Sequence, residues 1–414
     1  MFVTNGWTGG QYSVFRALFG LYLAVHFASL IRWGTELFSD RGVLPRGSDS
    51  PLLHLFPNVL ALADGPAVVA TLLALGTIAG LLLAAGLWDR AAAIAAWYVL
   101  ACLFGRNPLI ANPALPFVGW MLLAHAFLPG APYGSIAARG RADPGAGWRM
   151  PQPLFVAAWA VMAIGYSYSG AHKLASPSWI DGTALARVLD NPLARPGEMR
   201  ELLLSAPPAL LKLATWGALG LELLFAPLAL IRRARPWIWT LMVGMHFGLL
   251  ATIDFADLTL GMFLLHAFTF DPAWLSPTSA PGKDTVFYDG HCGLCHRFVR
   301  FVLAEDRAGH FEFAPLNGEH FLSSVRPADR AGAPDSIVVR TTEGEILVRS
   351  AAVRRVLARL GGLWRAFAAV GAFVPSGLLD RLYDGVARVR LRVFSRPQET
   401  CPLLPSHLRG RFHP

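Results

Sequence analysis

The chain has 414 residues, of which 54% are hydrophobic and 15% are charged. An average soluble domain carries about 25% charged residues, so this composition indicates a membrane protein. Four cysteines are too few to hold a chain of this length together as a disulfide framework. The formal net charge of +9 lies mostly in short loops and after residue 283, where membrane orientation and anionic headgroups explain it better than nucleic acid does.

Apolar runs fill most of the first 271 positions. A helix needs about 20 apolar residues to cross a bilayer, and runs near this length predict an α-helical membrane bundle of about eight spans. The expected spans are residues 12–33, 66–87, 91–106, 109–128, 153–172, 209–231, 236–254 and 257–271. Residues 1–270 are therefore the predicted transmembrane domain.

Basic residues in the short loops predict the orientation of these spans. The two basic loops, separated by two spans, contain Arg139, Arg141 and Arg149 in one and Arg232, Arg233 and Arg235 in the other. Short loops rich in Arg and Lys stay in the cytoplasm. For an even number of spans, residues 272–414 are then also cytoplasmic, in a protein integral to the inner (plasma) membrane.

Several ionisable residues lie in or near the predicted spans, where such groups usually face a cavity or pair with one another. These residues are Arg16, His26, Glu222, His246, Asp254 and Asp257. Glu222 and His246 lie on neighbouring predicted spans and form the pair that we most expect to meet. A functional site and a structural contact between helices are both open interpretations of this pair.

The stretch 166–174 ends an apolar run with small residues, His172 and Lys173. A lysine partly withdrawn from water at the membrane boundary can release its proton and act as a base. The alternative is a lysine whose charged end reaches the interface from a helix end, which is the commoner situation. Lys173 is therefore a candidate catalytic residue.

The residues Ser169-Gly170-Ala171-His172-Lys173-Leu174, together with Trp179 and Gly182, resemble the horizontally transferred transmembrane (HTTM) family, which includes the vitamin K-dependent gamma-carboxylases. Arg16 with Phe19-Gly20, and His246 followed by Leu260-Gly261-Met262-Phe263, also match. The resemblance covers about residues 10–275. It implies a quinone or hydroquinone cofactor and a catalytic base at Lys173, with His172, Glu222 and His246 as cofactor-binding candidates. This chain lacks the large lumenal region of the carboxylases.

Residues 271–283 are rich in Pro and Ser and mark the predicted linker between two domains. The β-branched and aromatic run after this linker predicts a strand at 285–288 that breaks at Asp289-Gly290. Cys292 and Cys295 follow at the start of an amphipathic helical pattern. A strand, then Cys-x-x-Cys, then a helix is the arrangement of a thioredoxin-like redox site. Residues 284–414 are thus predicted to form a small α/β thioredoxin-like domain.

The position of the two cysteines suits thiol chemistry. A thiol attacks only as its thiolate, and a helix N-terminus lowers the pKa of a cysteine placed there, which is the predicted place of Cys292. Cys295, one helical turn later, is close enough to resolve a mixed disulfide formed at Cys292. Asp289 is a candidate acceptor for the proton of the second thiol.

Two other interpretations of the Cys-x-x-Cys motif are open. A structural zinc site needs about four ligands, and His291 and His296 would have to complete the set. The five residues from Cys292 to His296 also spell the Cys-x-x-Cys-His motif of covalent c-type haem. We expect no metal at this site.

The match at this motif extends along the domain. Tyr288-Asp289-Gly290-His291-Cys292-Gly293-Leu294-Cys295, Phe313-Ala314-Pro315-Leu316 and Gly361-Gly362-Leu363-Trp364 resemble the DCC thiol-disulfide oxidoreductase family, named for its Asp-Cys-Cys set. The tail Cys401-Pro402-Leu403-Leu404-Pro405 also resembles the end of that family. The resemblance covers residues 284–414 and implies a thioredoxin-like fold with a redox-active Cys-x-x-Cys site.

Basic residues are frequent near the end of the domain. They alternate with apolar residues and include Arg381, Arg388, Arg390, Arg392 and Arg396. A solvated helix face is the default interpretation, and docking on anionic lipid is the alternative.

The preferred function is an integral membrane thiol-disulfide oxidoreductase, coupled to a carboxylase-like membrane domain that binds a quinone-like cofactor. One alternative is a gamma-carboxylase-like enzyme that uses a base on a hydroquinone or a peptide, and another is a non-catalytic membrane scaffold. The expected partners are membrane lipid and an unknown thiol or disulfide, in a protein or a small molecule. Nucleic acid is not expected.

Overall fold

The structure is a computed structural model that describes residues 5–110, 112–278, 281–331, 336–394 and 405–414. The chain divides into two compact units. One unit consists of residues 15–130 and 151–270, and the other consists of residues 1–14, 131–150 and 271–414. The second unit thus includes the predicted linker and two segments from the N-terminal part of the chain.

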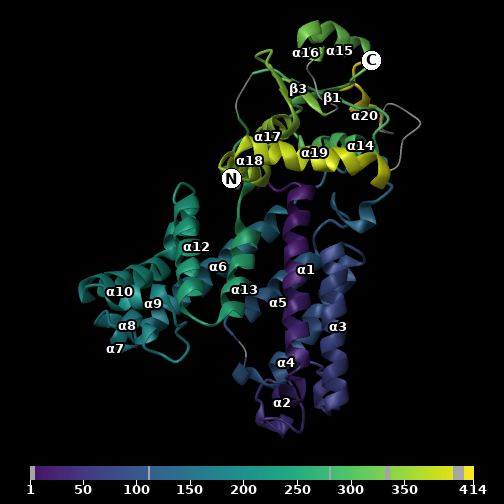
Figure 1. The fold of residues 1–414 in the computed structure, drawn as a ribbon. Helices are drawn as coiled ribbons and strands as arrows, with labels where there is room; N and C mark the ends of the chain where they lie inside the picture. Colours follow the sequence, from purple (N-terminus) through teal and green to yellow (C-terminus); the bar gives the residue numbers. More distant parts are fainter. Residues whose placement is uncertain (1–4, 111, 279–280, 332–335, 395–404) are drawn as a thin grey trace. The chain divides into compact units, whose positions relative to one another are not determined.

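The first unit is mostly helical. Its helices, the first of which begins in the other unit, are α1 (Gly9–Ile31), α2 (Gly34–Phe38), α3 (Pro66–Ala85), α4 (Asp89–Arg106), α5 (Leu115–Ala126), α6 (Gln152–Lys173), α7 (Pro177–Ile180), α8 (Ala184–Leu189), α9 (Glu198–Leu204), α10 (Pro208–Leu223), α11 (Phe225–Leu230), α12 (Arg235–Thr252) and α13 (Ala256–Thr269) (Figure 1). Short 3₁₀ helices cover Gly47–Asp49, Val59–Ala61 and Pro108–Ile110 here, and Ile136–Ala138 and Pro272–Trp274 in the other unit. Proline in the first turn begins α3, α6, α10 and α12, where its missing N–H is not needed.

Within the described residues, three helices, α1, α3 and α6, are long and apolar enough to cross a membrane. The number rises to at most five if two bent pairs each count as one span: α9 with α10, bent by 106°, and a second pair in the C-terminal part, bent by 118°. Each of the eight expected spans overlaps a helix, but α5 has 12 residues and α13 has 14. The number of about eight spans therefore stays a prediction.

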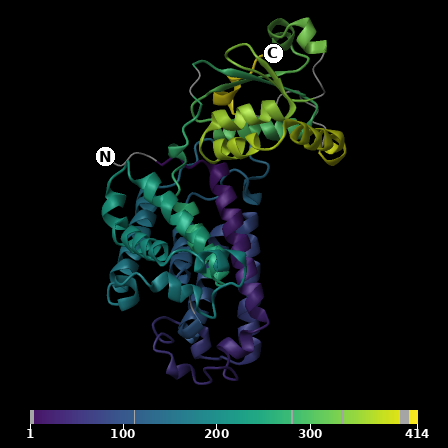
Figure 2. The same ribbon diagram turned by 60° about the vertical axis from the view of Figure 1, so that its left-hand side comes forward.

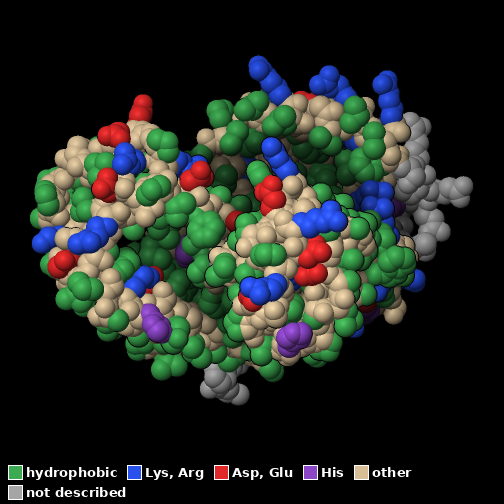
Figure 3. Space-filling model, turned by 90° about the horizontal axis from the view of Figure 1, so that it is seen from below, with side chains coloured by type: hydrophobic (Ala, Val, Ile, Leu, Met, Phe, Trp, Pro, Cys, Tyr) green, Lys and Arg blue, Asp and Glu red, His purple; other side chains and the backbone are tan. Residues whose placement is uncertain are grey.

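Large hydrophobic side chains are exposed along the long apolar helices. On α1 and α3 they include Leu18, Leu21, Val25, Leu75, Ile78 and Leu81. Hydrophobic side chains also cover much of the face seen in Figure 3, with charged groups scattered among them. Large exposed apolar surfaces of this kind are typical of proteins that contact membranes or other proteins.

The second unit contains a four-stranded mixed sheet. The strands are β1 (Asp284–Tyr288), β2 (Phe311–Pro315), β3 (Val338–Arg340) and β4 (Ile346–Val348), in the spatial order β2-β1-β3-β4. Strand β1 pairs with β2 in parallel and with β3 antiparallel, and β3 pairs with β4 antiparallel. The strand that the sequence predicts before the cysteines is β1.

Helices cover both faces of this sheet. They are α14 (Gly293–Glu305), α15 (Glu319–Ser324), α16 (Pro327–Ala331), α17 (Arg349–Leu360), α18 (Gly362–Ala372), α19 (Ser376–Val393) and α20 (Ser406–Arg409). Figure 1 and Figure 2 show α14, α17, α18 and α19 on one side of the strands and α15 and α16 on the other. Alternating side chains of β1 fill two cores: Val286 packs with α14 and α17, and Phe287 packs with α15.

A buried carboxylate explains why N-terminal residues belong to the second unit. Glu305, at the end of α14, accepts hydrogen bonds from the Thr8 hydroxyl, from the Gly10 amide at 2.8 Å and from the Trp364 indole at 2.6 Å. Arg307 donates to the carbonyl oxygens of Trp7 and Trp148. These contacts join segments far apart in the sequence.

Candidate functional site

The two cysteines of the motif lie where the sequence predicts, at the start of α14. Cys292 is the N-cap residue, with the extended backbone (φ −106°, ψ 112°) that an N-cap requires. Its Sγ accepts a hydrogen bond from the Cys295 amide at 3.3 Å, in place of the oxygen of a usual capping residue. Cys292, Cys295 and Cys102 are free cysteines, and Cys401 lies outside the described residues.

The two thiols have opposite electrostatic surroundings. A hydrogen bond from the Cys295 side chain lowers the pKa of Cys292 to about 6, and the Cys295 amide and the charge of Arg390 act in the same direction against burial. The same thiol-to-thiol hydrogen bond, together with burial and the charge of Cys292, raises the pKa of Cys295. At neutral pH the pair therefore holds one thiolate, at Cys292, and one thiol, at Cys295.

Helix α19 covers this dithiol. Cys292 is fully buried, and Arg390 of α19, only 4% exposed, lies with Nη2 3.8 Å from Oδ2 of Asp289. From the same face of the helix, the Tyr383 hydroxyl accepts a hydrogen bond of 2.9 Å from the Ile337 amide, just before β3. The default expectation of a solvated face is thus wrong for Arg390, because its spacing of seven residues from Tyr383 places both on the inner face of α19.

Asp289 lies beside the pair, as expected from its position in the sequence. Its carboxylate accepts a hydrogen bond of 2.9 Å from the His291 amide and faces Arg390. Its backbone carbonyl accepts the Cys292 amide at 3.2 Å. These contacts make Asp289 a residue that shapes the turn before α14, and its role as a proton acceptor for Cys295 stays a prediction.

The surroundings of the motif bear on the zinc and haem alternatives. Within the described residues, no group of three or more His, Cys, Asp or Glu side chains is placed to hold a metal ion. Nε2 of His296 lies 2.8 Å from the Gly290 carbonyl oxygen, a hydrogen bond that turns the ring back onto its own loop. Both cysteines are buried in the hydrophobic core of the domain.

A cavity of about 720 Å³ lies among α5, α6, α10, α12 and α13 in the helical unit. The candidate base Lys173 and the three cofactor-binding candidates His172, Glu222 and His246 all line it. Its other walls are largely apolar and aromatic, with contributions from Phe117, Met162, Tyr166, Tyr168, Trp179, Met245 and Met262. The sequence predicts Lys173, His172, Glu222 and His246 as site residues, and in the structure these four residues line one cavity.

Lys173 is held by three kinds of contact. Its ammonium forms an ion pair with Glu222, donates a hydrogen bond to the Ser169 hydroxyl at 3.1 Å, and lies 4.8 Å from the ring centroid of Trp179. A carboxylate, a hydroxyl and an aromatic face all stabilise a cation. These contacts fix the end of the Lys173 side chain at the cavity wall.

The pair expected between Glu222 and His246 is replaced by two other pairs. Glu222 contacts Lys173, because α6 and α10 pack directly on each other, and His246 lies 2.7 Å through Nε2 from the Tyr166 hydroxyl. The His172 ring packs edge-on against Tyr168, with centroids 4.3 Å apart.

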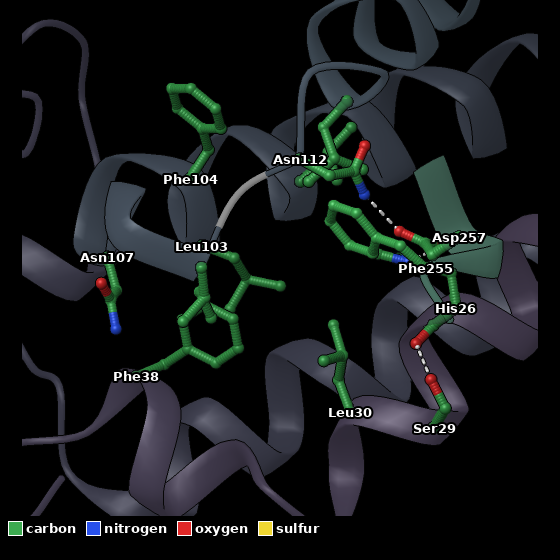
Figure 4. A pocket seen from close by; sticks show the side chains of 13 residues that line it. His26, Ser29, Leu30, Phe38, Leu103, Phe104, Asn107, Asn112, Phe255 and Asp257 are labelled. Carbon is green, nitrogen blue, oxygen red and sulfur yellow. Dashed lines mark hydrogen bonds and ion pairs between the residues drawn. The ribbon is translucent and has the colours of Figure 1, made fainter. Parts of the chain in front are cut away.

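The other ionisable residues of the helical unit lie elsewhere. Arg16 is buried and donates to the carbonyl oxygens of α3, at 2.8 Å for Ala84, which indicates a structural role. Asp254 is paired with Arg195 at 3.5 Å on the surface. His26 and Asp257 pair at 3.0 Å beside a smaller cavity of about 190 Å³ (Figure 4).

Several site residues are not predicted from the sequence. Arg390 and Tyr383 reach the dithiol from a helix about 90 residues later, and their common helical face is the only local signal. Trp179 enters the sequence analysis only through the HTTM resemblance, and its ring lies against Lys173. Ser169 and Tyr166 belong to the stretch around Lys173, where the helical spacing of four residues between Ser169 and Lys173 indicates their contact.

Comparison with known proteins gives matches in the C-terminal part of the chain. The model of the family "DCC1-like thiol-disulfide oxidoreductase" matches residues 286–396. The uncharacterized protein YuxK of Bacillus subtilis (strain 168) is 32% identical over 133 residues, which are 31% of this chain and 93% of YuxK. A chloroplastic DCC family protein of Arabidopsis thaliana is 28% identical over 134 residues, 31% of this chain and 77% of that protein. No solved structure matches significantly.

Proposed function

The C-terminal domain of this chain belongs to the DCC1-like thiol-disulfide oxidoreductase family, and from this premise we propose that the chain is an integral membrane thiol-disulfide oxidoreductase acting through Cys292 and Cys295. The observation that carries the proposal is the unequal pair at the start of α14, a stabilised thiolate beside a thiol of raised pKa. The β1-α14-β2 unit followed by two antiparallel strands supports the thioredoxin-like fold of such enzymes.

The unequal pair is suited to a two-step exchange. The Cys292 thiolate attacks one sulfur of a substrate disulfide, the substrate S–S bond breaks, and the other sulfur leaves as a thiolate that takes up a proton. Cys295 then loses its proton and attacks Sγ of Cys292, which releases the second substrate thiol and closes the Cys292–Cys295 disulfide. The substrate gains two electrons and the dithiol loses two. Because α19 covers Cys292, this helix has to shift before a protein disulfide reaches the sulfur.

The packing of the second unit supports one orientation in the membrane. Residues 1–14, 131–150 and 271–414 form one compact unit and must therefore lie on one side of the bilayer. The segment 131–150 contains Arg139, Arg141 and Arg149, which the distribution of basic residues places in the cytoplasm. In the proposed enzyme the dithiol faces the cytoplasm, where cysteines stay reduced unless they take part in redox chemistry.

For the membrane part, we extend the proposal to a quinone-like cofactor in the cavity lined by Lys173. A volume of about 720 Å³ lies within the range of about 300–1,000 Å³ typical of small-molecule sites. The apolar and aromatic walls suit a flat ring with an apolar tail, and in this proposal Lys173 and His246, which line the cavity, contact the ring oxygens. Such a group supplies a two-electron carrier that dissolves in lipid.

The base-driven alternative uses the same cavity. Lys173 would accept a proton from a hydroquinone or a peptide, and it can do so only as a neutral amine. The Lys173 amine lies against Glu222, so this contact has to open before Lys173 takes a proton from a substrate. The oxidoreductase is the preferred function because the family match lies in the domain that carries the dithiol.

Trapping a mixed disulfide tests the proposal. In membranes containing the full chain, Cys295→Ser leaves an attacking thiolate with no resolving thiol, so we expect covalent adducts that reductant releases. Cys292→Ser should give none, and Cys102→Ser, a change at a buried residue of α4, should behave as the unchanged chain. Adducts that persist in Cys292→Ser, or their absence from Cys295→Ser, would contradict the exchange mechanism.

Lys173→Ala tests the link between the two parts. Lys173 ends the 22-residue helix α6, which is about 33 Å long and begins directly after the segment 131–150. In the proposed enzyme a mobile carrier in the cavity exchanges electrons with the dithiol. If the cofactor and dithiol are coupled, Lys173→Ala slows re-oxidation of the dithiol by a water-insoluble quinone but leaves mixed-disulfide trapping intact.

A further inference from the structure

The outer face of α19 carries a continuous apolar stripe. The stripe consists of Leu378, Leu382, Val386, Val389 and Val393, spaced three and four residues apart, all of them exposed. This spacing places the five side chains on one face of the helix. Leu382 is 61% exposed and Val393 is 69% exposed, so the described residues of the second unit leave this face uncovered.

The apolar surface continues onto the preceding helix. In α18 and the turn after it, Phe367, Val370 and Phe373 are exposed, and Phe373 reaches 90%. Helices α18 and α19 together are apolar enough for a membrane span but are bent by 118°. The inner face of α19 holds Arg390 and Tyr383 against the dithiol, which anchors the helix on the domain. The pair therefore suits contact along a surface rather than a crossing.

Exposed arginines flank the stripe on one side. Arg381, Arg388 and Arg392 are spaced by seven and four residues and share an arc of α19 next to the apolar face. An apolar stripe edged by arginines, on a helix whose remaining surface is polar and charged, is the pattern of helices that lie in the interface of a membrane. Arginine stems can reach along the apolar face while their charges contact headgroups.

We infer that α18 and α19 form a docking surface for an anionic lipid bilayer. The charge complementarity between the three exposed arginines and acidic headgroups supports this occupant. The chain connection supports it as well: α13, an apolar helix, ends at Thr269 and β1 begins at Asp284, so the intervening residues span at most about 50 Å.

Docking of this surface fixes the place of the dithiol. The inner face of α19 covers Cys292 while the apolar stripe, about a quarter turn away around the same helix, lies on lipid, so docking holds the cysteines close to the headgroups. The inference concerns this surface alone and holds whether or not the dithiol exchanges with substrates.

A photo-crosslinking amino acid in the full chain tests the inference. The full chain, with p-benzoylphenylalanine in place of Leu382 or, separately, Phe373, is placed in nanodiscs of phosphatidylcholine and phosphatidylglycerol, and lipid adducts are measured by mass spectrometry. The matched control is Leu322 of α15, which is 54% exposed on the opposite side of the sheet. We expect about tenfold more lipid adduct at 382 and 373 than at 322.

Two results would overturn the inference. One is an adduct yield at 382 no higher than at 322, and the other is crosslinking of 382 to a second copy of the chain in place of lipid. The role of acidic headgroups is tested by changing Arg381, Arg388 and Arg392 together to Gln, which should lower the lipid adduct yield at position 382 several-fold. Equal yields with and without these changes would overturn the role of acidic headgroups.

Discussion

At the level of single residues, Cys292 and Cys295 differ although they are chemically identical and three positions apart. Cys292 accepts the hydrogen bond from Cys295, and this bond stabilises the thiolate of one sulfur and the thiol of the other. The pKa of Cys292, at about 6, lies below cytoplasmic pH, so the attacking form is already present there. The pair is thus prepared for exchange before a substrate arrives.

This difference predicts a titration of the reduced protein. The ultraviolet absorbance of the thiolate should rise with pH through a midpoint near 6, since deprotonation of Cys292 is complete well above that pH and absent well below it. Mixed-disulfide formation by Cys295→Ser should rise with pH too. Loss of the absorbance step in Cys292→Ser is the control, and a midpoint near the ordinary cysteine value would contradict the stabilised thiolate.

Arg390 makes a separate contribution to the same titration. Its positive charge lowers the pKa of both cysteines, so Arg390→Gln should move the absorbance midpoint of Cys292 to higher pH. Arg392→Gln removes an exposed arginine from the same helix and should leave the midpoint unchanged. Equal shifts in the two variants would show a general effect of net charge instead of a contact at the site.

At the level of elements, α14 carries the dithiol at its first turn and Glu305 at its last. Glu305→Ala leaves the Trp364 indole and the Gly10 amide without their acceptor, and a buried unsatisfied donor costs about 1–3 kcal/mol. Native-state hydrogen exchange should therefore show the start of α1 and α18 less stable by about 2–4 kcal/mol. Glu345→Ala, at an exposed glutamate, should leave the hydrogen-exchange protection of both segments nearly unchanged. Unaltered protection in Glu305→Ala would disprove the anchoring role of Glu305.

The contact between α6 and α10 depends on one glycine. A Cβ at Gly170 would lie 2.8 Å from the Leu223 backbone nitrogen, so Gly170→Ala forces the two helices apart and disturbs the adjacent Lys173–Glu222 pair. We expect a loss of about 1–3 kcal/mol, seen as a lower Tm in detergent. A Cβ at Gly217 meets no atom within 4 Å, so Gly217→Ala should be neutral or stabilising. A Tm for Gly170→Ala at or above that of Gly217→Ala would refute this.

The sequence predicts the local features of the site and misses those that depend on distant partners. The strand, the break at Asp289-Gly290 and the helix beginning at Cys292 follow from periodicity and turn residues, so β1 and α14 are predicted correctly. Burial of Arg390 is missed, because a periodic pattern does not reveal which face of α19 meets the domain. The lining of the cavity by Lys173 and Glu222 follows from the expectation that ionisable residues in apolar helices face inward.

At the level of the whole molecule, the division of the chain differs from a simple boundary at residues 271–283. Composition changes sharply there, which is the only signal that a sequence offers for a linker. The contacts of Glu305 with Thr8 and of Arg307 with Trp148 join residues about 300 and 160 positions apart, and no local pattern predicts them. The segments 1–14 and 131–150 consequently belong with the redox domain.

This division yields a prediction for membrane sidedness. Since residues 131–150 and 271–414 form one unit, new cysteines at exposed Arg139 and Glu345 should react with a membrane-impermeant maleimide from the same side, the cytoplasmic one. Glu201→Cys, in α9 between α6 and α10, should react from the other side. In a Cys401→Ser background the remaining native cysteines are buried and should stay unlabelled.

Labelling of inverted vesicles alone is expected for the cysteines at 139 and 345, and labelling of right-side-out vesicles alone for the cysteine at 201. Opposite sides for 139 and 345 would disprove the compact unit, whereas outward labelling of both would keep the unit and reverse the orientation, placing the dithiol in a compartment where Cys-x-x-Cys is more often a stable disulfide.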